Sequence, residues 1–529
     1  HYEALEKDSY GKFRFVAGIN PRSFSWQLAP GEAFYTPEAV LNFSADGFRG
    51  LSGQLHSFIR EHIVRGVWKH KPRPVLLNSW EACYFKIDEK KLLQLAKAGK
   101  NAGIELFVMD DGWFLGRNDD TSSLGDWEPD PKKLPGGIAS LSKKIKELGM
   151  DFGIWVEPEM ISENSNLYKE HPDWAMMIPG HPHSEGRNQR LLDLCNPEVQ
   201  QYVIDSMTKV FSSGEIRYVK WDMNRNFSDI YSPYLPAAKQ GETAHRYVLG
   251  LYHIMDELTT RFPEILFEGC SSGGNRFDLG ILSYFPQIWA SDNTDALCRT
   301  GIQNSYSYGY PLSVFTAHVS SCPNHQTLRI TPLETRFQVA SFGILGYECN
   351  LKDLSGSDLN AIREQIALYK KWRDVFQFGT FYRGTENEDS DSETLSWTCV
   401  SPDGRRAVGL FFRRLTTPNQ SHDWYRPVGL LPDVKYHFYG RNIKYNLKDF
   451  GDLVNTVSPV HIKQGSILQE ILSRFVNMNG EKEELTAYGD TLMRAGIALK
   501  PAFAGTGYNS DTRLFPDFSS RIYFMEAVE

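Results

Sequence analysis

Apolar runs that end in polar residues recur along the middle of the chain, and helix-like stretches separate them. One such stretch, at 89–102, is amphipathic and is followed by Gly103, and another spans 197–211. Continuous apolar strands that alternate with helices are typical of parallel strands buried on both faces. The predicted strands are 74–80, 105–112, 151–159, 217–225, 265–270, 287–292, 312–319 and 340–348.

These strand–helix units together span roughly 300 residues, which is the size of a (β/α)8 barrel. The competing architecture is a doubly wound open sheet. No Gly-x-Gly-x-x-Gly follows the first strand, so the dinucleotide-binding fingerprint of that architecture is absent. The sequence therefore predicts an α/β protein with a (β/α)8 TIM barrel at residues 66–385.

The region before the predicted barrel carries β patterns. Residues 13–19 and 24–28 alternate with period two, and residues 48–67 have helical spacing. We predict that residues 1–65 are the end of an N-terminal β-domain plus a linker helix. Because the β pattern begins abruptly and the chain starts at His1 rather than Met, we expect an N-terminal truncation.

Helical periodicity stops near Phe381, and short β-like runs follow at 394–400, 406–412, 434–439 and 520–524. Gly, Pro, Asn and Asp separate these runs, a pattern typical of an antiparallel β-sandwich. We predict such a C-terminal β-sandwich at residues 386–529. The acidic segment 386–391 is predicted to be a solvated loop.

Composition narrows the classes of function. The chain has 529 residues, of which 41% are hydrophobic and 23% are charged, as in soluble globular proteins. A net charge of −8 and a pI near 6.0 argue against nucleic acid or an anionic membrane as the main partner. No apolar run approaches the roughly 18–20 residues that a membrane span needs.

The seven cysteines are scattered, and the sequence contains no Cys-x-x-Cys pair. This pattern fits a reducing compartment better than a disulfide framework or a zinc knot. We therefore predict a cytoplasmic location, while the expected missing N-terminus leaves secretion open.

The active site of a (β/α)8 barrel lies at the carboxyl ends of its strands. In this sequence several strand ends carry carboxylates, together with tryptophans, amides and a lysine. One such residue alone is more often a cap or an ion pair, but several that converge predict a polar site for a polyol. The residues at the strand ends are Asn78, Trp80, Asp110, Asp111, Trp155, Glu157, Lys220, Asp222, Asn224, Cys270, Asp292 and Asp295.

Residues 220–225 crowd a cation, an indole, a carboxylate and an amide into one strand end. A carboxylate beside a fixed cation stays ionised and can act as a nucleophile or base. Taken alone, Lys220 and Asp222 would more often form an ion pair that closes a strand. The other strand-end carboxylates make catalysis the preferred interpretation.

Paired carboxylates without metal ligands indicate glycoside chemistry, in which one attacks the anomeric centre and the other protonates the leaving oxygen. The alternative is a metal hydrolase, which needs histidines clustered on strands. The first strand ends in Asn78-Ser79-Trp80 without a His-x-His, and His318 and His325 are isolated. We interpret both histidines as structural and expect neither a metal ion nor a cofactor.

The chain resembles glycoside hydrolase family 36, the bacterial α-galactosidases, in four segments. They are Lys-Trp-Asp-Met-Asn-Arg (220–225), Met-Asp-Asp-Gly-Trp (109–113), Cys-Ser-Ser-Gly-Gly-Asn-Arg-Phe-Asp (270–278) and Ser-Asp-Asn-Thr-Asp-Ala (291–296). The similarity also covers 78–81, 155–159 and 186–189. Members of that family carry a large N-terminal β-supersandwich, of which residues 1–65 would be only the end.

The resemblance implies that Asp222 is the nucleophile and Asp292 the general acid/base of a retaining double displacement. Lys220 would keep Asp222 ionised for attack, whereas Asp292 must begin protonated, so burial or neighbours should raise its pKa. After the glycosyl-enzyme forms, Asp292 as a carboxylate would activate water. Asp295 lies three residues further on and is the rival for the acid/base role, which the sequence alone leaves open.

The resemblance also implies how a galactose ring would be held. Asp110 and Asp111 would accept hydrogen bonds from O4 and O6, and Lys220 and Arg187 would reach other hydroxyls. Asn224, Cys270 and Gly273 would lie near O2. Trp155 and Trp80 would form hydrophobic walls. Family members often have glycine where Asn275 stands, which leaves the width of the corner near O2 open.

The sequence thus predicts a retaining exo-glycosidase that hydrolyses terminal α-D-galactosyl residues. One alternative is an α-N-acetylgalactosaminidase on the same scaffold, and another is a transglycosylase like raffinose synthase. A sugar-binding barrel without catalysis would lack one of the carboxylates, and none is missing. The expected partner is a small carbohydrate, and the resemblance implies a homo-oligomer, a tetramer.

Overall fold

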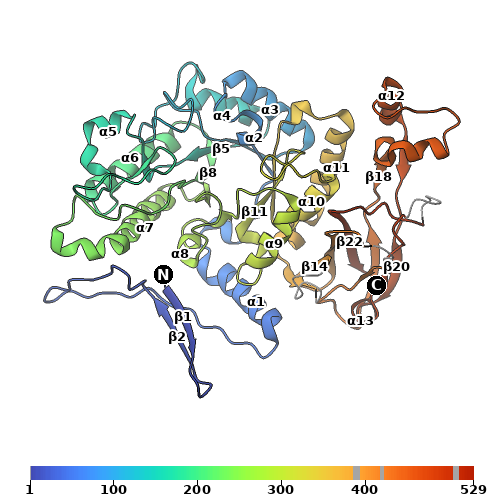
Figure 1. Ribbon diagram of the computed structural model, residues 1–529, viewed down its shortest axis with the longest axis horizontal. Helices are drawn as coiled ribbons and strands as arrows, with labels where there is room; N and C mark the ends of the chain where they lie inside the picture. The colour runs from blue at the N-terminus through green and yellow to red at the C-terminus, as the bar shows by residue number, and fades with distance from the viewer. Residues whose placement is uncertain (1, 385–392, 418–421, 504–510, 529) are drawn as a thin grey trace.

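The computed structural model describes residues 2–384, 393–417, 422–503 and 511–528. At its centre, parallel strands close into a barrel in the order β10-β11-β12-β3-β4-β5-β8-β9 (Figure 1). Each of them overlaps one of the predicted strands, so the (β/α)8 barrel is confirmed. The strands are β3 (Leu76–Asn78), β4 (Leu106–Met109), β5 (Asp151–Val156), β8 (Ile216–Trp221), β9 (Leu266–Gly269), β10 (Gln287–Trp289), β11 (Phe315–Ser320) and β12 (Ile344–Glu348).

Two of the predicted strands begin too early. The start of the seventh run forms the short 3-10 helix η5 (Leu312–Val314), and the start of the eighth is the end of a helix, α10 (Leu333–Ser341). Both segments are buried and mostly composed of small or apolar residues. Short apolar runs of this kind do not distinguish a buried helix end from a strand.

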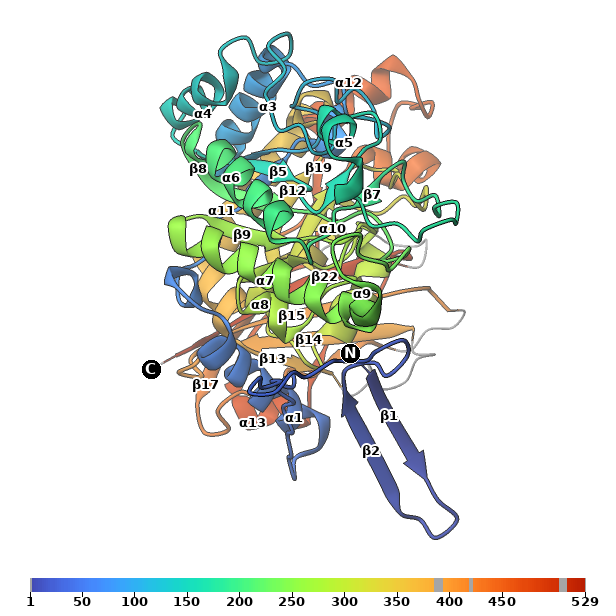
Figure 2. The same cartoon turned by 90° about the vertical axis from the view of Figure 1, so that its left-hand side faces the viewer.

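Helices surround the barrel, as the two perpendicular views show (Figures 1 and 2). Helix α3 (Glu89–Ala102) is capped at its start by Asp88, whose side chain accepts a hydrogen bond from the backbone N–H of Lys91, and is followed by Gly103 with φ 100°. The bounds of the other helices, besides α10, are α4 (Gly137–Glu147), α6 (Pro197–Ser212), α7 (Thr243–Arg261), α8 (Leu279–Leu282), α9 (Ala296–Tyr306) and α11 (Gly356–Phe378). Short elements in the loops are α2 (Trp80–Cys83), β6 (Met160–Ile161), α5 (Asn166–Glu170), η3 (Pro172–Trp174), β7 (Arg190–Leu191), η4 (Ala237–Glu242), η6 (Leu351–Asp353) and, ahead of the first strand, η2 (Val67–Lys69).

The N-terminal segment is only partly as predicted. Strands β1 (Tyr2–Lys7) and β2 (Phe13–Gly18) form an antiparallel hairpin that projects from the body, and α1 (Gly47–Phe58) continues as the π-helix η1 (Ile59–Ile63) (Figure 2). The strand predicted at 24–28 is wrong. Trp26 stacks its ring edgewise against His245 of α7, and the Ser25 N–H donates to the Gly241 carbonyl at 3.1 Å. The segment therefore packs on a helix instead of pairing with a strand.

The C-terminal region forms an antiparallel sheet in the order β13-β14-β15-β22-β17-β20, which confirms the predicted antiparallel domain. The bounds are β13 (Thr380–Arg383), β14 (Thr394–Val400), β15 (Arg406–Arg413), β17 (Lys435–Gly440), β20 (Glu484–Tyr488) and β22 (Ser519–Ala527). This sheet packs on the barrel, where Trp372 of α11 lies 4.9 Å from the Phe524 ring. The acidic segment 386–391 lies outside the described residues.

The sequence did not predict the helices of this region. They are the 3-10 helix η8 (Leu447–Thr456), α12 (Ile467–Phe475) and α13 (Gly489–Arg494). Short strand pairs join β16 (Trp424–Tyr425) to β21 (Ile497–Ala498), and β18 (Lys444–Asn446) to β19 (Asn477–Asn479). None of the helices in the described part of the chain is long and apolar enough to cross a membrane.

Candidate active site

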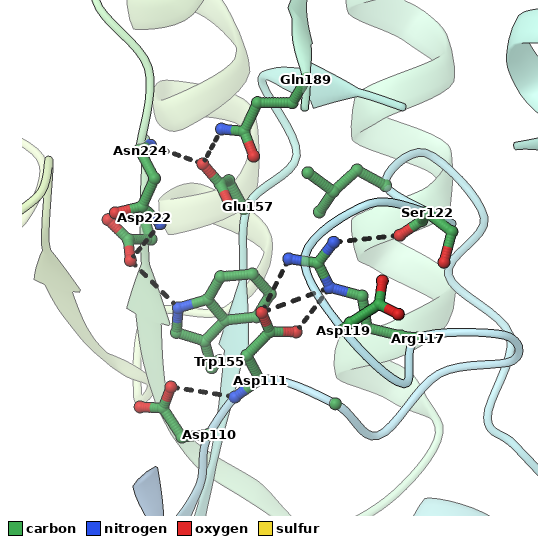
Figure 3. Close-up of polar contacts among 12 residues, drawn as sticks. Asp110, Asp111, Arg117, Asp119, Ser122, Trp155, Glu157, Gln189, Asp222 and Asn224 are labelled. Atoms are coloured by element: carbon green, nitrogen blue, oxygen red, sulfur yellow. Dashed lines mark hydrogen bonds and ion pairs between the residues drawn. The ribbon is translucent and has the colours of Figure 1, made fainter. Parts of the chain in front are cut away.

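The predicted polar side chains gather at the carboxyl-terminal mouth of the barrel because all its strands run in the same direction. Figure 3 shows those from β4, β5, β8 and the loops that follow them, directed toward one another. The cluster combines carboxylates, amides, a guanidinium and an indole, which suits recognition of a polyhydroxylated ligand.

Asp222 follows β8 and is buried, with hydrogen-bond donors on both oxygens. Its Oδ2 accepts from the Trp155 indole at 3.2 Å and from the Asn224 carboxamide at 2.8 Å, and its Oδ1 accepts from the Met223 N–H at 2.8 Å. Burial opposes ionisation of this carboxyl. The charge of Lys220 and the donors around the carboxyl outweigh burial and lower the pKa of Asp222, so it is ionised near neutral pH.

Lys220 lies on the same strand but donates to a carboxylate on another one. Its Nζ lies 3.0 Å from Asp110 Oδ2, which also accepts from Asn78 Nδ2 at 2.7 Å. Burial disfavours the ammonium, but the charge of Asp110, with further carboxylates, raises the pKa of Lys220 well above its usual range. The side chain is therefore a fixed cation between β4 and β8.

Asp111 is held by a partner that sequence reasoning missed. The Arg117 guanidinium donates to both of its carboxylate oxygens, with Nη2 to Oδ2 at 2.8 Å and Nε to Oδ1 at 3.0 Å. Both side chains are buried. Burial raises the pKa of Asp111 although Arg117 opposes that shift. Arg117 lies in the long loop after β4. Because it does not follow directly on a strand, a search of the strand ends in the sequence does not find it.

Asp292 occupies a different environment from Asp222. Its Oδ1 accepts from the Trp289 indole at 2.8 Å. The residue is exposed to solvent at the mouth, yet the surrounding protein partly desolvates its carboxyl. Burial within the mouth and then the negative charge of Asp222 raise the pKa of Asp292. The two carboxyls thus have pKa values shifted in opposite directions.

The carboxylate of Asp295, the alternative candidate for the acid/base, makes hydrogen bonds and an ion pair that stabilise the fold. It caps α9 by accepting from the Cys298 N–H at 3.0 Å, pairs with Arg329 at 2.7 Å, and accepts from the Thr327 hydroxyl at 2.7 Å. Although burial opposes ionisation, these donors lower the pKa of Asp295. An acid that must begin protonated needs the opposite shift.

The segment after β9 forms a tight corner beside both carboxyls. Cys270 is buried, and burial followed by the charge of Asp222 raises the pKa of its thiol well above the usual range, so it stays protonated. At Gly273 φ is +89°, and a Cβ there would lie 2.9 Å from the Cα of Ser291. Glycine is therefore required at this position by both conformation and space. Asn275 turns back and donates to the Ser271 carbonyl at 2.7 Å.

Two residues that were predicted to bind the sugar, Trp80 and Arg187, are not buried. Trp80 is half-buried, its backbone N–H donates to Asn78 Oδ1 at 2.7 Å, and its ring packs edgewise against Phe85. Arg187 is exposed in a loop and has a positive φ. Within the described part of the chain, no hydrogen bond or ion pair joins it to the cluster. Its predicted contact with the sugar stays a prediction.

The two histidines are each paired with one carboxylate. His318 Nδ1 lies 2.9 Å from Glu348, and its ring lies 4.3 Å from that of Trp289. His325 Nδ1 lies 3.1 Å from Glu81. Within the described ranges, His, Cys, Asp and Glu side chains form no group of three or more that could hold a metal ion.

Comparisons with known proteins agree on one family. The family model described as Melibiase matches residues 33–379, and that of the glycosyl hydrolase family 36 C-terminal domain matches residues 394–525. The chain is 46% identical over 439 residues to α-galactosidase AgaA of Geobacillus stearothermophilus, covering 83% of this chain and 60% of that protein. It is 46% identical over 436 residues to α-galactosidase 1 of Pediococcus pentosaceus, covering 82% and 59%.

Solved structures extend this likeness over nearly the whole chain. The crystal structure of AgaA, a GH36 α-galactosidase, aligns with a TM-score of 0.86 and 42% identity, covering 99% of this chain and 65% of that one. The α-galactosidase from Lactobacillus brevis aligns with a TM-score of 0.87 and 40% identity, covering 100% and 64%. Variants of AgaA have been solved with raffinose and with stachyose. The chain spans about 60% of the length of the curated relatives described above.

Proposed function

Because the chain belongs to the melibiase family, glycoside hydrolase family 36, we propose that it hydrolyses terminal α-D-galactosyl residues. The proposed reaction is a retaining double displacement on oligosaccharides or glycoconjugates. One observation supports it above the others. Two neighbouring carboxyls have opposite pKa shifts, with that of Asp222 lowered and that of Asp292 raised. Retaining glycosidases need such a pair, an ionised nucleophile and a protonated acid.

In this proposal the Asp222 carboxylate attacks the anomeric carbon while Asp292 gives its proton to the leaving oxygen. A covalent glycosyl-enzyme results, and the aglycone leaves as an alcohol. Asp292, now a carboxylate, then takes a proton from water, which attacks the same carbon and releases Asp222. Because each step inverts the configuration, the product keeps the α-configuration of the substrate.

The residues around Asp222 are proposed to bind the non-reducing sugar. Asp110 and Asp111 would accept hydrogen bonds from O4 and O6, with Lys220 and Arg187 on other hydroxyls. Asp110 and Asp111 are held at their present positions by Lys220 and Arg117, which supports a preorganised acceptor pair. The remaining proposed contacts are Asn224, Cys270 and Gly273 near O2, and Trp155 and Trp80 as apolar walls.

Solved complexes of AgaA with raffinose and stachyose favour α-galactosides as substrates for this chain also. A direct test compares hydrolysis of an aryl α-galactoside with that of an aryl α-N-acetylgalactosaminide. We expect release of the aryl group from the first compound. Turnover of the 2-acetamido compound alone would instead support the N-acetylgalactosaminidase alternative. A dominant transfer product in the presence of a sugar acceptor would support the transglycosylase alternative.

The proposal extends to the setting in which the enzyme acts. All seven cysteines are free thiols in the structure, which supports a reducing, cytoplasmic location. We propose that the chain associates with itself, as a tetramer by family resemblance. Light scattering at micromolar concentration tests this, and a single monomeric species would contradict it.

A further inference from the structure

Glu157 is a further buried carboxyl that faces the proposed nucleophile Asp222, and the two-step reaction leaves it without a role. It follows β5 directly and is 1% exposed. Its Oε1 accepts two hydrogen bonds, from the Gln189 carboxamide at 2.7 Å and from the Asn224 backbone N–H at 2.5 Å (Figure 3). One carboxylate oxygen thus connects the loop before β7 to the segment after β8.

Asn224 is in turn the residue through which Glu157 reaches Asp222. The Asn224 backbone is fixed by Glu157, and its carboxamide oxygen accepts from the Ser272 hydroxyl at 3.0 Å. Its carboxamide nitrogen then donates to Asp222 Oδ2 at 2.8 Å. An ionised carboxylate is only an acceptor, so this contact fixes which end of the amide faces Asp222.

Building on the proposed function, we propose that Glu157 is a positioning residue for the nucleophile: by anchoring the Asn224 backbone, it sets the carboxamide that holds Asp222. Loss of the anchor would leave Asp222 Oδ2 with its Trp155 contact but without a firmly held second donor. Because reaction rates fall steeply when a reacting group is displaced by a fraction of an ångström to one ångström, kcat should suffer more than KM.

The charges that face Glu157 give the arrangement a pH dependence. They are Asp222 directly after β8 and Arg117 in the loop after β4. Burial and then the charge of Asp222 raise the pKa of Glu157 to about 7, against the two donors and Arg117. We therefore expect Glu157 to exchange its proton near neutral pH. An ionised acceptor binds an N–H more strongly than a neutral one. The hydrogen bond from the Asn224 N–H to Glu157 should therefore become stronger as the pH rises through the pKa of Glu157.

The first test uses kinetics with an aryl α-galactoside. Glu157→Ala, which removes the acceptor, should lower kcat about 10²-fold with a smaller change in KM. Glu157→Gln keeps one acceptor oxygen and should restore most of that loss, which a general loss of folding would not do. The matched control is Glu170→Ala, an exposed carboxylate at the end of α5 in the same β5–α6 connection, which should stay within about twofold.

A double-mutant cycle then tests whether Glu157 acts through Asn224. Asn224→Ala should itself lower kcat, and adding Glu157→Ala should cost little more, because both changes break the same chain of contacts. Multiplicative losses, or a Gln variant as impaired as the Ala variant at equal thermal stability, would overturn the proposal.

The second test needs no turnover, so it decides the positioning role even if the proposed function fails. In a deuterated sample labelled with [¹⁵N]asparagine, the Asn224 backbone amide can be assigned by the absence of its signal in Asn224→Ala. Its proton shift should titrate near pH 7 in the wild type and stay flat in Glu157→Gln, with Asn224 still structured. An Asn224 amide shift that is the same in the wild type and in Glu157→Gln at every pH would refute the assignment.

Discussion

Lys220 Nζ donates to Asp110 Oδ2 at 3.0 Å, so a side chain of β8 reaches past β5 to the carboxylate that follows β4. The same ammonium is the foremost group that lowers the pKa of Asp222 against the effect of burial. One cation therefore serves two carboxylates, the proposed sugar acceptor and the proposed nucleophile. A substitution at Lys220 should separate these two roles.

Lys220→Met should raise the pKa of Asp222, because the charge that favours its ionised form is gone. The acid limb of the kcat/KM profile should consequently move to higher pH, and the plateau should fall by about 10²-fold or more. Lys220→Arg keeps the positive charge and is the matched control. Its acid limb should stay near that of the wild type even if its KM rises. An unmoved acid limb in Lys220→Met would show that Lys220 does not control the nucleophile.

Arg117→Met should destabilise the protein, because it leaves the Asp111 carboxylate buried without its partner. Breaking a buried ion pair on one side typically costs about 3–5 kcal/mol. The midpoint of urea or thermal unfolding reports this loss, and galactose protection against unfolding should weaken as well. Lys91→Met removes a partner from the exposed Lys91–Asp88 pair and should cost at most about 1 kcal/mol. Equal effects of the two substitutions would contradict the role given to Arg117.

Trp289→Phe tests the assignment of the acid. The Trp289 indole lowers the pKa of Asp292 by donating to its carboxylate, in opposition to burial and to Asp222. Without that donor the pKa of Asp292 should rise further, so the acid stays protonated to higher pH. The alkaline limb of kcat/KM should shift upward, measured with a substrate whose leaving group is poor. A downward shift or none would argue that another group gives the proton.

The fold and the site could be predicted from the sequence to different extents. Barrel strands are buried on both faces, so each leaves a continuous apolar run, and these runs located all the barrel strands. The strand predicted at 24–28 is wrong because alternation of apolar and polar residues indicates only which side chains are buried. Trp26 is covered by α7 and not by a neighbouring strand. The periodicity of apolar residues does not indicate whether a helix or a strand buries them.

The same limit applies to the site. Strand ends meet at one mouth by the geometry of a parallel barrel, so Asp110, Asp222 and Asp292 could be grouped from sequence alone. Arg117 and Gln189 come from long loops, whose path depends on tertiary contacts that leave no periodic signal. The opposite pKa shifts of Asp222 and Asp292 likewise arise from burial and through-space charge, which exist only once the chain is folded.

Chelation should leave the enzyme active, because the proposed mechanism uses two carboxyls and no metal ion. We expect kcat and KM to be unchanged within about twofold after treatment with EDTA followed by desalting. Activity that is lost on treatment and returns on addition of zinc or manganese would contradict the two-carboxyl mechanism.

Substitution of the two carboxyls, combined with azide, should separate their roles. Asp222→Ala removes the covalent route and should lower kcat by about 10⁴–10⁶-fold. Azide entering from the vacated face would displace the leaving group once and give a β-galactosyl azide. Asp292→Ala should still form the glycosyl-enzyme from an activated aryl galactoside, since such a leaving group needs little protonation. Hydrolysis of that intermediate, now without a base, should become slow.

Azide should then relieve the slow step in Asp292→Ala and give an α-galactosyl azide, because two inversions have occurred. The anomeric configuration of each product, read from the coupling of the anomeric proton, decides between the roles. Asp295→Ala is the matched control, because Asp295 caps α9 and pairs with Arg329. It should lose thermal stability without accumulating glycosyl-enzyme. The same anomer from both catalytic variants, or azide rescue in Asp295→Ala and not in Asp292→Ala, would reverse the assignment.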